Sequence, residues 1–419
     1  MGRVIQLILF LKNFATGIMA PVLTLALLAH GATIHTISLL IGIYSFTVIA
    51  AEFPSGIFAD LYGRKNAFLL SCVLLMLSSL LMGLSQSTVL LCCAMALSGL
   101  GRAFSSGSLD ALVIDGAGAG EGALVKTTTQ LSILESAGLC AGALAGGLLS
   151  QLGARYEGNL ATNALIYASL ILLTHFSVHE LPHKSSAERG NSRLGLLRTQ
   201  VQDSLAFVKQ RGTVRALLVL SLCTGFALIC VETYWQPALS SYQPQPWVFG
   251  ATSFAGFACV ILGSWMAKHL LAKRPNSSIA ILLLFRAVYG MALILPAFLS
   301  PQLFFISAYL MAYFFLGGGS VAENTLVNRM IPASHRASIL SLFSFVVQMG
   351  GLLASLCGYG VSRLAGFQSM WLAAGGLLVI CVGVFALRPT GLGMPGPSTH
   401  VLAPPEDEAF PHPLKHRLD

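Results

Sequence analysis

Charged residues are scarce in this chain. Asp, Glu, Lys and Arg supply 10% of its 419 positions, whereas an ordinary soluble domain carries about 25%. Hydrophobic residues supply 55%, and the mean hydropathy is +0.77. A chain with so few charges cannot cover a normal water-exposed surface. The composition therefore excludes an ordinary soluble domain and indicates a protein whose solvent is lipid.

Signals for catalysis and for bound metal are also missing. The chain has no Walker loop, so we expect no ATP hydrolysis. Its ten histidines and nine cysteines show no metal-ligand spacing, and every cysteine lies in an apolar run, where a reduced packing residue is the simplest interpretation. We therefore expect no cofactor, no metal ion and no enzymatic activity.

Long apolar runs are abundant instead. A bilayer core about 30 Å thick needs about 20 apolar residues in a helix, and the period-2 alternation of a membrane barrel is missing. The runs predict twelve spanning helices, at 4–29, 36–59, 67–85, 88–110, 126–151, 158–178, 213–235, 247–268, 277–299, 302–324, 337–362 and 366–387. A polar stretch divides them six and six. The predicted units are a six-helix bundle at 1–180, a cytoplasmic linker at 181–212, a second six-helix bundle at 213–387, and a disordered cytoplasmic tail at 388–419.

The basic residues favour one side of the predicted membrane. With the N-terminus inside, 19 of the 24 Lys and Arg residues fall on the inner side, and Arg155 and Arg363 fall on the outer side. This bias follows the positive-inside rule and requires an even number of spans, with both termini in the cytoplasm. It also accounts for the net charge of +8 through anionic lipid rather than nucleic acid. We expect a monomer in the cytoplasmic (inner) membrane of a bacterium.

A charged loop follows the second predicted span. It reads Gly56-Ile-Phe-Ala-Asp60-Leu-Tyr-Gly63-Arg64-Lys65, and it resembles the signature loop of the major facilitator superfamily in both sequence and place. The resemblance covers essentially the whole chain. It implies an all-α membrane protein with twelve helices in two pseudo-symmetric six-helix bundles, which carries a solute by alternating access.

In that family the loop latches the two halves in the outward-facing state. The resemblance gives this role to Gly56, Asp60, Gly63, Arg64 and Lys65. We expect Asp110, near the inner end of the fourth span, to be the partner of Arg64. A turn glycine with a positive-inside anchor is the alternative, but it leaves Asp60 unexplained. Leu61 departs from the family pattern, which often has a basic residue there.

Glycines recur in the fifth span, at Gly138, Gly142, Gly146 and Gly147, and the first three share one side of the helix. They look like the glycine-rich motif of the family's drug:proton antiporters, although that motif has a proline where this chain has Ala143. The alternative is a packing face of small residues. The resemblance implies the efflux branch of the family.

Four charged residues lie inside the predicted spans of the first half. Lys12, Glu52, Arg102 and Glu135 each lie seven to nine residues from the inner end of a span, where a charge costs roughly 2.5–3.5 kcal/mol. We expect a buried network, with Lys12–Glu52 and Arg102–Glu135 as pairs because those helices are neighbours in sequence. A carboxylate at such a depth can take up a proton and couple transport to it. The alternatives are static pairs that fix helix packing, or direct contact of the two cations with an anionic substrate.

Other side chains within the spans are candidates for a pocket or a gate. The pocket candidates are Asn13, Glu232, Trp235 and Gln348, although an interfacial belt explains Glu232 and Trp235 equally well. A second gate is predicted at the inner end of the tenth span, at Glu323, Arg329 and Arg336. We interpret Arg286 of the ninth span as a packing or snorkelling residue.

These expectations combine into one functional hypothesis. The chain is a secondary active transporter whose partners are a small-molecule substrate, protons and the lipid bilayer. The preferred version is proton-coupled export of a small amphipathic organic compound, as in drug or antibiotic efflux. The alternative is a proton symporter or a facilitator that imports a metabolite.

Overall fold

The computed structural model describes residues 3–106, 108–115, 121–178, 208–209, 211–298, 301–331 and 336–387. Every regular element in these ranges is a helix, and none of these residues forms a strand. Most of the predicted linker 181–212 and all of the predicted tail 388–419 lie outside the described residues. The division into domains at these segments therefore stays a prediction.

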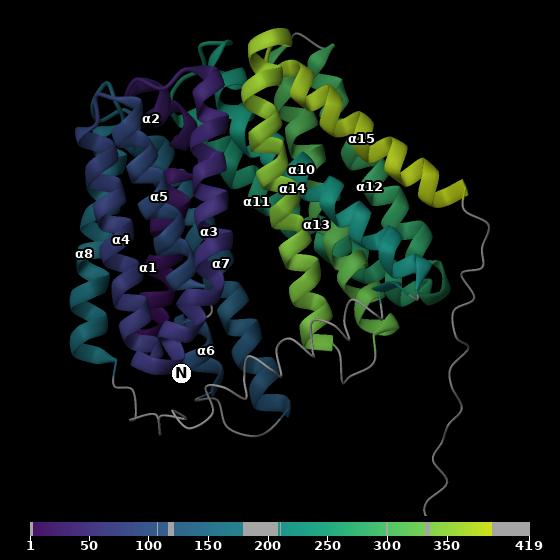
Figure 1. Ribbon diagram of the computed structural model, residues 1–419, viewed down its shortest axis with the longest axis horizontal. Coiled ribbons are helices and arrows are strands. Elements are labelled where there is room, and N and C mark those ends of the chain that lie inside the picture. The colour runs from purple at the N-terminus through teal and green to yellow at the C-terminus, as the bar shows by residue number, and fades with distance from the viewer. Residues whose placement is uncertain are drawn as a thin grey trace, which may run out of the picture. The chain divides into compact units, whose positions relative to one another are not determined.

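The first half of the fold contains eight helices, shown in purple and blue in Figure 1. They are α1 (Arg3–Met19), α2 (Leu23–Ala29), α3 (Ile34–Tyr62), α4 (Arg64–Leu84), α5 (Thr88–Ser105), α6 (Ser108–Asp115), α7 (Glu121–Leu149) and α8 (Glu157–Ser177). The first predicted span is not straight, because α1 and α2 meet at a bend of 52°. Pro21 lies at the bend and has no backbone N–H to continue the helical hydrogen bonds.

The second half contains six α-helices, shown in teal, green and yellow in Figure 1. They are α10 (Gly212–Ser240), α11 (Trp247–Lys273), α12 (Ser278–Ile294), α13 (Gln302–Met330), α14 (Arg336–Ala365) and α15 (Gln368–Leu387), with 3-10 turns at Pro275–Ser277 and Leu295–Ala297. In the described residues, 11 helices are long and apolar enough to cross a membrane, and the bent α1–α2 pair raises this to 12. The predicted all-α fold is confirmed.

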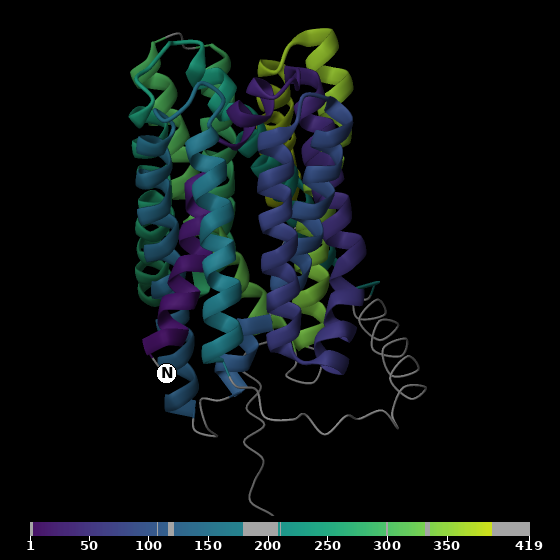
Figure 2. The same cartoon turned by 90° about the vertical axis from the view of Figure 1, so that its left-hand side faces the viewer.

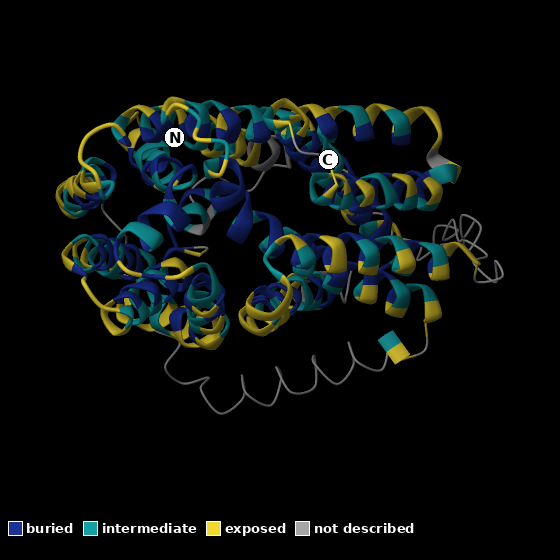
Figure 3. Cartoon of the chain, turned by 90° about the horizontal axis from the view of Figure 1, so that it is seen from above, coloured by how far each residue is buried: buried dark blue, intermediate teal, exposed yellow. Residues whose placement is uncertain are grey.

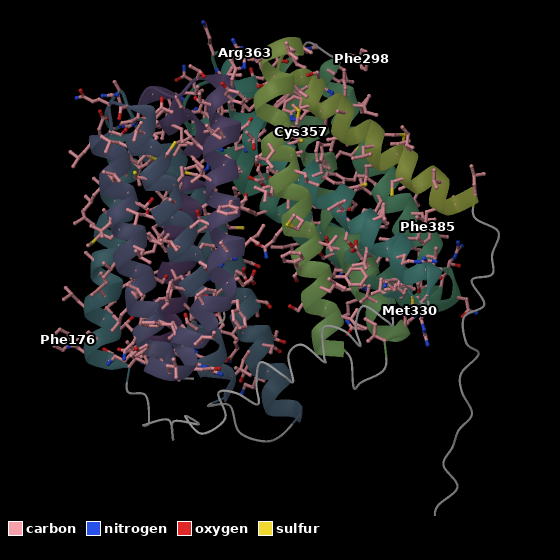
Figure 4. All side chains as sticks on the ribbon, in the orientation of Figure 1. Phe176, Phe298, Met330, Cys357, Arg363 and Phe385 are labelled. Atoms are coloured by element: carbon pink, nitrogen blue, oxygen red, sulfur yellow. The ribbon has the colours of Figure 1, made fainter. Side chains whose placement is uncertain are left out.

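The helix bundle has an N-terminal end and, opposite it, a far end. The N-terminal end holds Arg3, and Figure 4 marks it with Phe176 and Met330; the far end is marked by Phe298 and Arg363. Figure 2 shows the helices of the first half running between these two ends.

Apolar side chains cover the outward faces of the helices. Phe176 and Leu84 are 72% and 78% exposed, and Figure 3 shows exposed residues around the rim with buried residues inside it. In lipid such exposure is favourable, so contacts between helices must come from close packing of small residues instead. A Cβ atom on Gly142 of α7 would lie 2.3 Å from the carbonyl oxygen of Phe14 and 2.8 Å from Cα of Gly17. This close approach fixes α1 against α7.

Candidate functional site

Hydrogen bonds join the two halves at the far end, around the bend between α1 and α2. In an unbroken helix, the backbone N–H of Thr24 would donate to the carbonyl oxygen of Ala20. The side-chain amide of Gln236, on α10, takes the place of that bond. Its Nε2 donates to the Ala20 oxygen at 2.8 Å, and its Oε1 accepts from the Thr24 nitrogen at 2.9 Å and from the Thr24 hydroxyl at 2.7 Å. Gln236 is 2% exposed.

Further contacts between the halves lie near the same end. The hydroxyls of Ser38 and Tyr234 are hydrogen-bonded, and Nδ1 of His35 lies 3.2 Å from Oγ of Ser362. Ser38 and His35 begin α3, whereas Ser362 ends α14. The far end is therefore closed by polar contacts.

Two pairs of helices form the seams between the halves, α3 with α14 and α7 with α11. In the first seam, Nε2 of Gln348 donates to Oε2 of Glu52 at 3.1 Å. In the second, a Cβ on Gly147 would lie 2.6 Å from Cα of Gly250. Toward the N-terminal end the ribbons of the two halves diverge (Figure 1).

A cavity of about 820 Å³ lies between the halves. From the first half it is lined by residues of all eight helices, among them Lys12, Asn13, Arg102, Asp110 and Glu135. From the second half it is lined by Ile229, Glu232, Thr233, Gln236 and Phe257. A volume of this size accommodates a drug-sized ligand. The lining combines apolar side chains with a few polar and charged groups, as small-molecule sites usually do.

The charged residues of the first half pair differently from the prediction. Nζ of Lys12 lies 3.0 Å from Oδ2 of Asp110, so the expected Lys12–Glu52 pair is wrong. The pairing of Arg64 with Asp110 stays a prediction. The expectation failed because the spans that carry Lys12 and Glu52 are consecutive in sequence but do not pack closely against each other. Helix α1 packs against α7 and α8, whereas α3 packs against α5 and α14.

The expected Arg102–Glu135 pair is wrong as well. Arg102 lies beside the Tyr44 hydroxyl, and among the described residues no ion pair joins it to Glu135. Both side chains are exposed to the cavity instead of being buried against each other. The expected network is therefore not formed. Lys12 is paired with Asp110, and Arg102 and Glu135 are separate charges on the cavity wall.

The four pocket candidates separate into two groups. Asn13 and Glu232 line the cavity. Trp235 does not, because it is 1% exposed and its ring packs 4.9 Å from that of Tyr309. Gln348 lies in the α3–α14 seam.

One residue of the predicted second gate has a different role, whereas a gate at Arg329 and Arg336 stays a prediction. Glu323 is buried within the second half, where its Oε2 accepts from Nη2 of Arg286 at 2.6 Å and its Oε1 accepts from Ser221. Arg286 is 2% exposed and does not snorkel. Arg329 donates to the Ser278 hydroxyl at 3.1 Å, and Arg336 begins α14, with its side chain outside the described part of the chain.

A sequence signal for this ion pair exists in retrospect. Gly319 and Glu323 are one helical turn apart, so they share a face of α13. A Cβ on Gly319 would lie 3.1 Å from Cζ of Arg286, so the glycine makes room for the guanidinium beside the carboxylate. Nε and Nη1 of Arg286 have no hydrogen-bond partner in the described part of the chain.

The charged loop makes a tight turn at the N-terminal end. Gly63 has φ of +93° and connects α3 directly to α4, a conformation that favours glycine. Nζ of Lys65 donates to the carbonyl oxygen of His175 at 2.8 Å, near the end of α8. A Cβ on Gly56 would meet no described atom within 4 Å, so no helix approaches closely there in this state.

The glycines of α7 act in packing. Cβ atoms on Gly138 and Gly146 would lie 2.7 Å and 2.3 Å from the carbonyl oxygens of Phe10 and Ile18 on α1. Together with Gly142 and Gly147, they let α7 contact both α1 and, across the seam, α11. The structure thus gives the motif a role in packing, while a role in export stays a prediction.

A helical bundle with 11 or 12 candidate spans in its described residues, and a cavity of apolar, polar and charged residues between its halves, is the architecture of a membrane carrier. The family model of the Major Facilitator Superfamily matches residues 5–355, and the chain belongs to this superfamily. It is a transporter, not an enzyme.

The chain is similar to several known proteins. The uncharacterized MFS-type transporter YxaM of Bacillus subtilis (strain 168) is 24% identical over 385 residues, which cover 90% of this chain and 94% of YxaM. The crystal structure of nucleoside transporter NupG matches with a TM-score of 0.73 at 15% identity, over 91% of this chain and 97% of that one. A bacterial homolog to the human lysosomal transporter Spinster, in an inward-facing and unoccupied conformation, matches with a TM-score of 0.67 at 13% identity, over 91% and 95%. At these identities the solved structures are similar in fold alone.

Proposed function

We propose that this chain exports a small amphipathic organic compound in exchange for protons. The observation that carries the proposal is the cavity between the halves, which is lined by both charged and apolar residues and closed at the far end. The positive-inside bias supports a cytoplasmic position for the N-terminal end. The structure is then an inward-facing state that receives its substrate from the cytoplasm or the inner leaflet.

Alternating access requires the halves to close at the N-terminal end after substrate binds. The predicted latch at Asp60, Gly63 and Arg64 lies at this end. The open space around Gly56 supports the proposal, because a close approach of another helix is what this position permits when the latch forms. The same motion has to break the contacts of Gln236 at the far end.

Two carboxylates are the proposed proton carriers. Glu135 faces the cavity, and Glu52 accepts a hydrogen bond from Gln348 across the α3–α14 seam. A carboxylate that gains a proton becomes a weaker acceptor for this bond. Protonation of Glu52 is thereby linked to the separation of the halves, which is the coupling that an antiporter needs. Lys12 and Arg102 set the electrostatic potential around the two groups.

Transport in inverted vesicles tests this proposal. An imposed proton gradient should drive uptake of fluorescent dyes or antibiotics, and adding the compound should discharge part of the gradient. The Glu52→Gln/Glu135→Gln double variant should lose gradient-driven uptake and keep passive exchange. Glu157→Gln is the matched control, because this carboxylate lies at the far end and bonds to the Arg155 backbone outside the cavity.

Two results contradict the proposal. Uptake that still follows the proton gradient in the double variant removes these carboxylates from coupling. Counterflow of a metabolite, without gradient discharge by any dye or antibiotic, establishes the symporter or facilitator as the function instead.

A further inference from the structure

The cavity wall has an apolar region toward the far end. Its members lie near the far ends of their helices, and from the first half they are Met19, Leu23, Ile41, Met82, Met95 and Leu160. Ile229 of α10 faces the cavity from the second half. Methionine is flexible and polarizable, so a wall of this kind adapts to varied apolar shapes.

Glu232 is the one charged residue of the cavity lining that the second half supplies, and it lies toward this apolar region. The four others, Lys12, Arg102, Asp110 and Glu135, come from the first half. Two cations thus face three carboxylates in the lining, and Lys12 is already paired with Asp110. The cavity has an excess of one negative charge, and Glu232 is the carboxylate farthest from the cations along the helices.

The carboxylate of Glu232 has no cationic partner among the described residues. Its Oε1 accepts from the hydroxyl of Tyr313. Tyr313 packs against Tyr309 with ring centroids 4.5 Å apart, and Tyr309 packs against Trp235 at 4.9 Å. These three aromatic residues are buried and packed on one another. They fix the position of Tyr313 and, through its hydrogen bond, that of Glu232 at the cavity wall.

We propose that Glu232 binds the positively charged nitrogen or phosphonium group of the transported compound, whose hydrocarbon part contacts the apolar region. The substrate class is then an amphipathic organic cation. A lone carboxylate in apolar surroundings is costly unless an opposite charge meets it, and a bound cation supplies that charge. The rings of Tyr44 and Phe257, which also line the cavity, add faces that attract a cation. This assignment rests on the proposed function, since it names the substrate class of the same cavity.

Two ions of one shape and opposite charge test the assignment. Tetraphenylphosphonium and tetraphenylborate both carry four phenyl groups around a central atom. We expect the purified full chain in lipid nanodiscs to bind tetraphenylphosphonium saturably, and tetraphenylborate at least about tenfold more weakly. Equal affinity for the two ions, tighter binding of the borate, or no saturable binding of the phosphonium overturns the assignment.

The Glu232→Gln variant identifies the group responsible. We expect it to weaken phosphonium binding at least about tenfold, whereas the control Glu157→Gln binds like the original chain. Affinity of Glu232→Gln within about twofold of the original overturns the assignment.

A measurement on the unmodified chain covers the case in which Glu232→Gln does not fold. Dicyclohexylcarbodiimide modifies carboxyl groups in apolar surroundings, and mass spectrometry locates the product. Bound phosphonium should slow the modification of Glu232 and leave Glu157 unaffected. Equal rates at Glu232 with and without phosphonium overturn the assignment.

The binding experiments need no proton gradient, so their outcome does not depend on whether the proposed proton coupling is correct. If phosphonium binds through Glu232 but transport does not depend on the proton gradient, proton coupling is contradicted and the substrate class is not. If transport depends on the proton gradient but binding does not depend on the charge of the ion, the substrate class is contradicted and proton coupling is not.

Discussion

The side chain of Gln236 should decide how firmly the far end is closed. Replacing it with leucine removes three hydrogen bonds, one to the Ala20 carbonyl oxygen and two from Thr24. Side-chain hydrogen bonds inside membranes average about 0.6 kcal/mol each. Three of them give about 2 kcal/mol, which corresponds to about a thirtyfold shift from the closed toward the open far end.

Hydrogen exchange measured by mass spectrometry in nanodiscs reads this shift directly. The Thr24 amide donates to Gln236, so peptides that contain it should exchange up to about thirtyfold faster in Gln236→Leu. Peptides at the N-terminal end should exchange more slowly, because alternating access closes that end when the far end opens. Ser240→Ala is the control, since the hydroxyl of this nearby serine donates to the carbonyl oxygen of Pro237 in its own helix.

Two outcomes would refute this reasoning. Unchanged exchange at Thr24 would mean that the three bonds contribute nothing to closure. Faster exchange at both ends would mean that Gln236→Leu loosens the fold instead of shifting an equilibrium between two states.

The packing, the buried ion pair and the latch give further predictions. Gly142→Ala should lower the free energy of unfolding by about 1–3 kcal/mol, because its Cβ would overlap α1. Gly376→Ala is the control and should change this free energy little, because its Cβ meets no described atom within 4 Å. Unfolding in mixed detergent micelles compares the two variants. Arg286→Ala and Glu323→Ala should each lower the free energy of unfolding by about 3–5 kcal/mol, because each leaves one buried charge uncompensated. The double variant should lose less than the sum of the two, since it leaves no such charge. The same unfolding assay measures all three variants, and additive losses would argue against a coupled pair. Asp60→Asn should lower proton-driven uptake in vesicles without lowering the amount of folded protein, and undiminished uptake would remove Asp60 from the latch.

The sequence determined the fold class because lipid leaves the backbone few options. Every polar backbone group in the bilayer core must be satisfied within its own helix, so run length and apolar content suffice to predict the spans. The loop at Gly56–Lys65 identified the family for the same local reason, since its residues are consecutive. The polar stretch near residue 190 and the basic bias predicted a division and an orientation, which stay predictions.

Only the tertiary structure decided which charges meet. Lys12 pairs with Asp110, 98 positions away, and Arg286 pairs with Glu323 across two helices. Nothing in the periodicity of α1 or α12 indicates these partners, because a spanning helix chooses its neighbours through close packing at positions such as Gly142 and Gly319. The cavity, the seam between Glu52 and Gln348, and the exposure of Glu232 to the apolar wall arise in the same way. The amino-acid sequence thus determined that this chain crosses the membrane as a carrier, whereas contacts between distant helices decided where a substrate and a proton can bind.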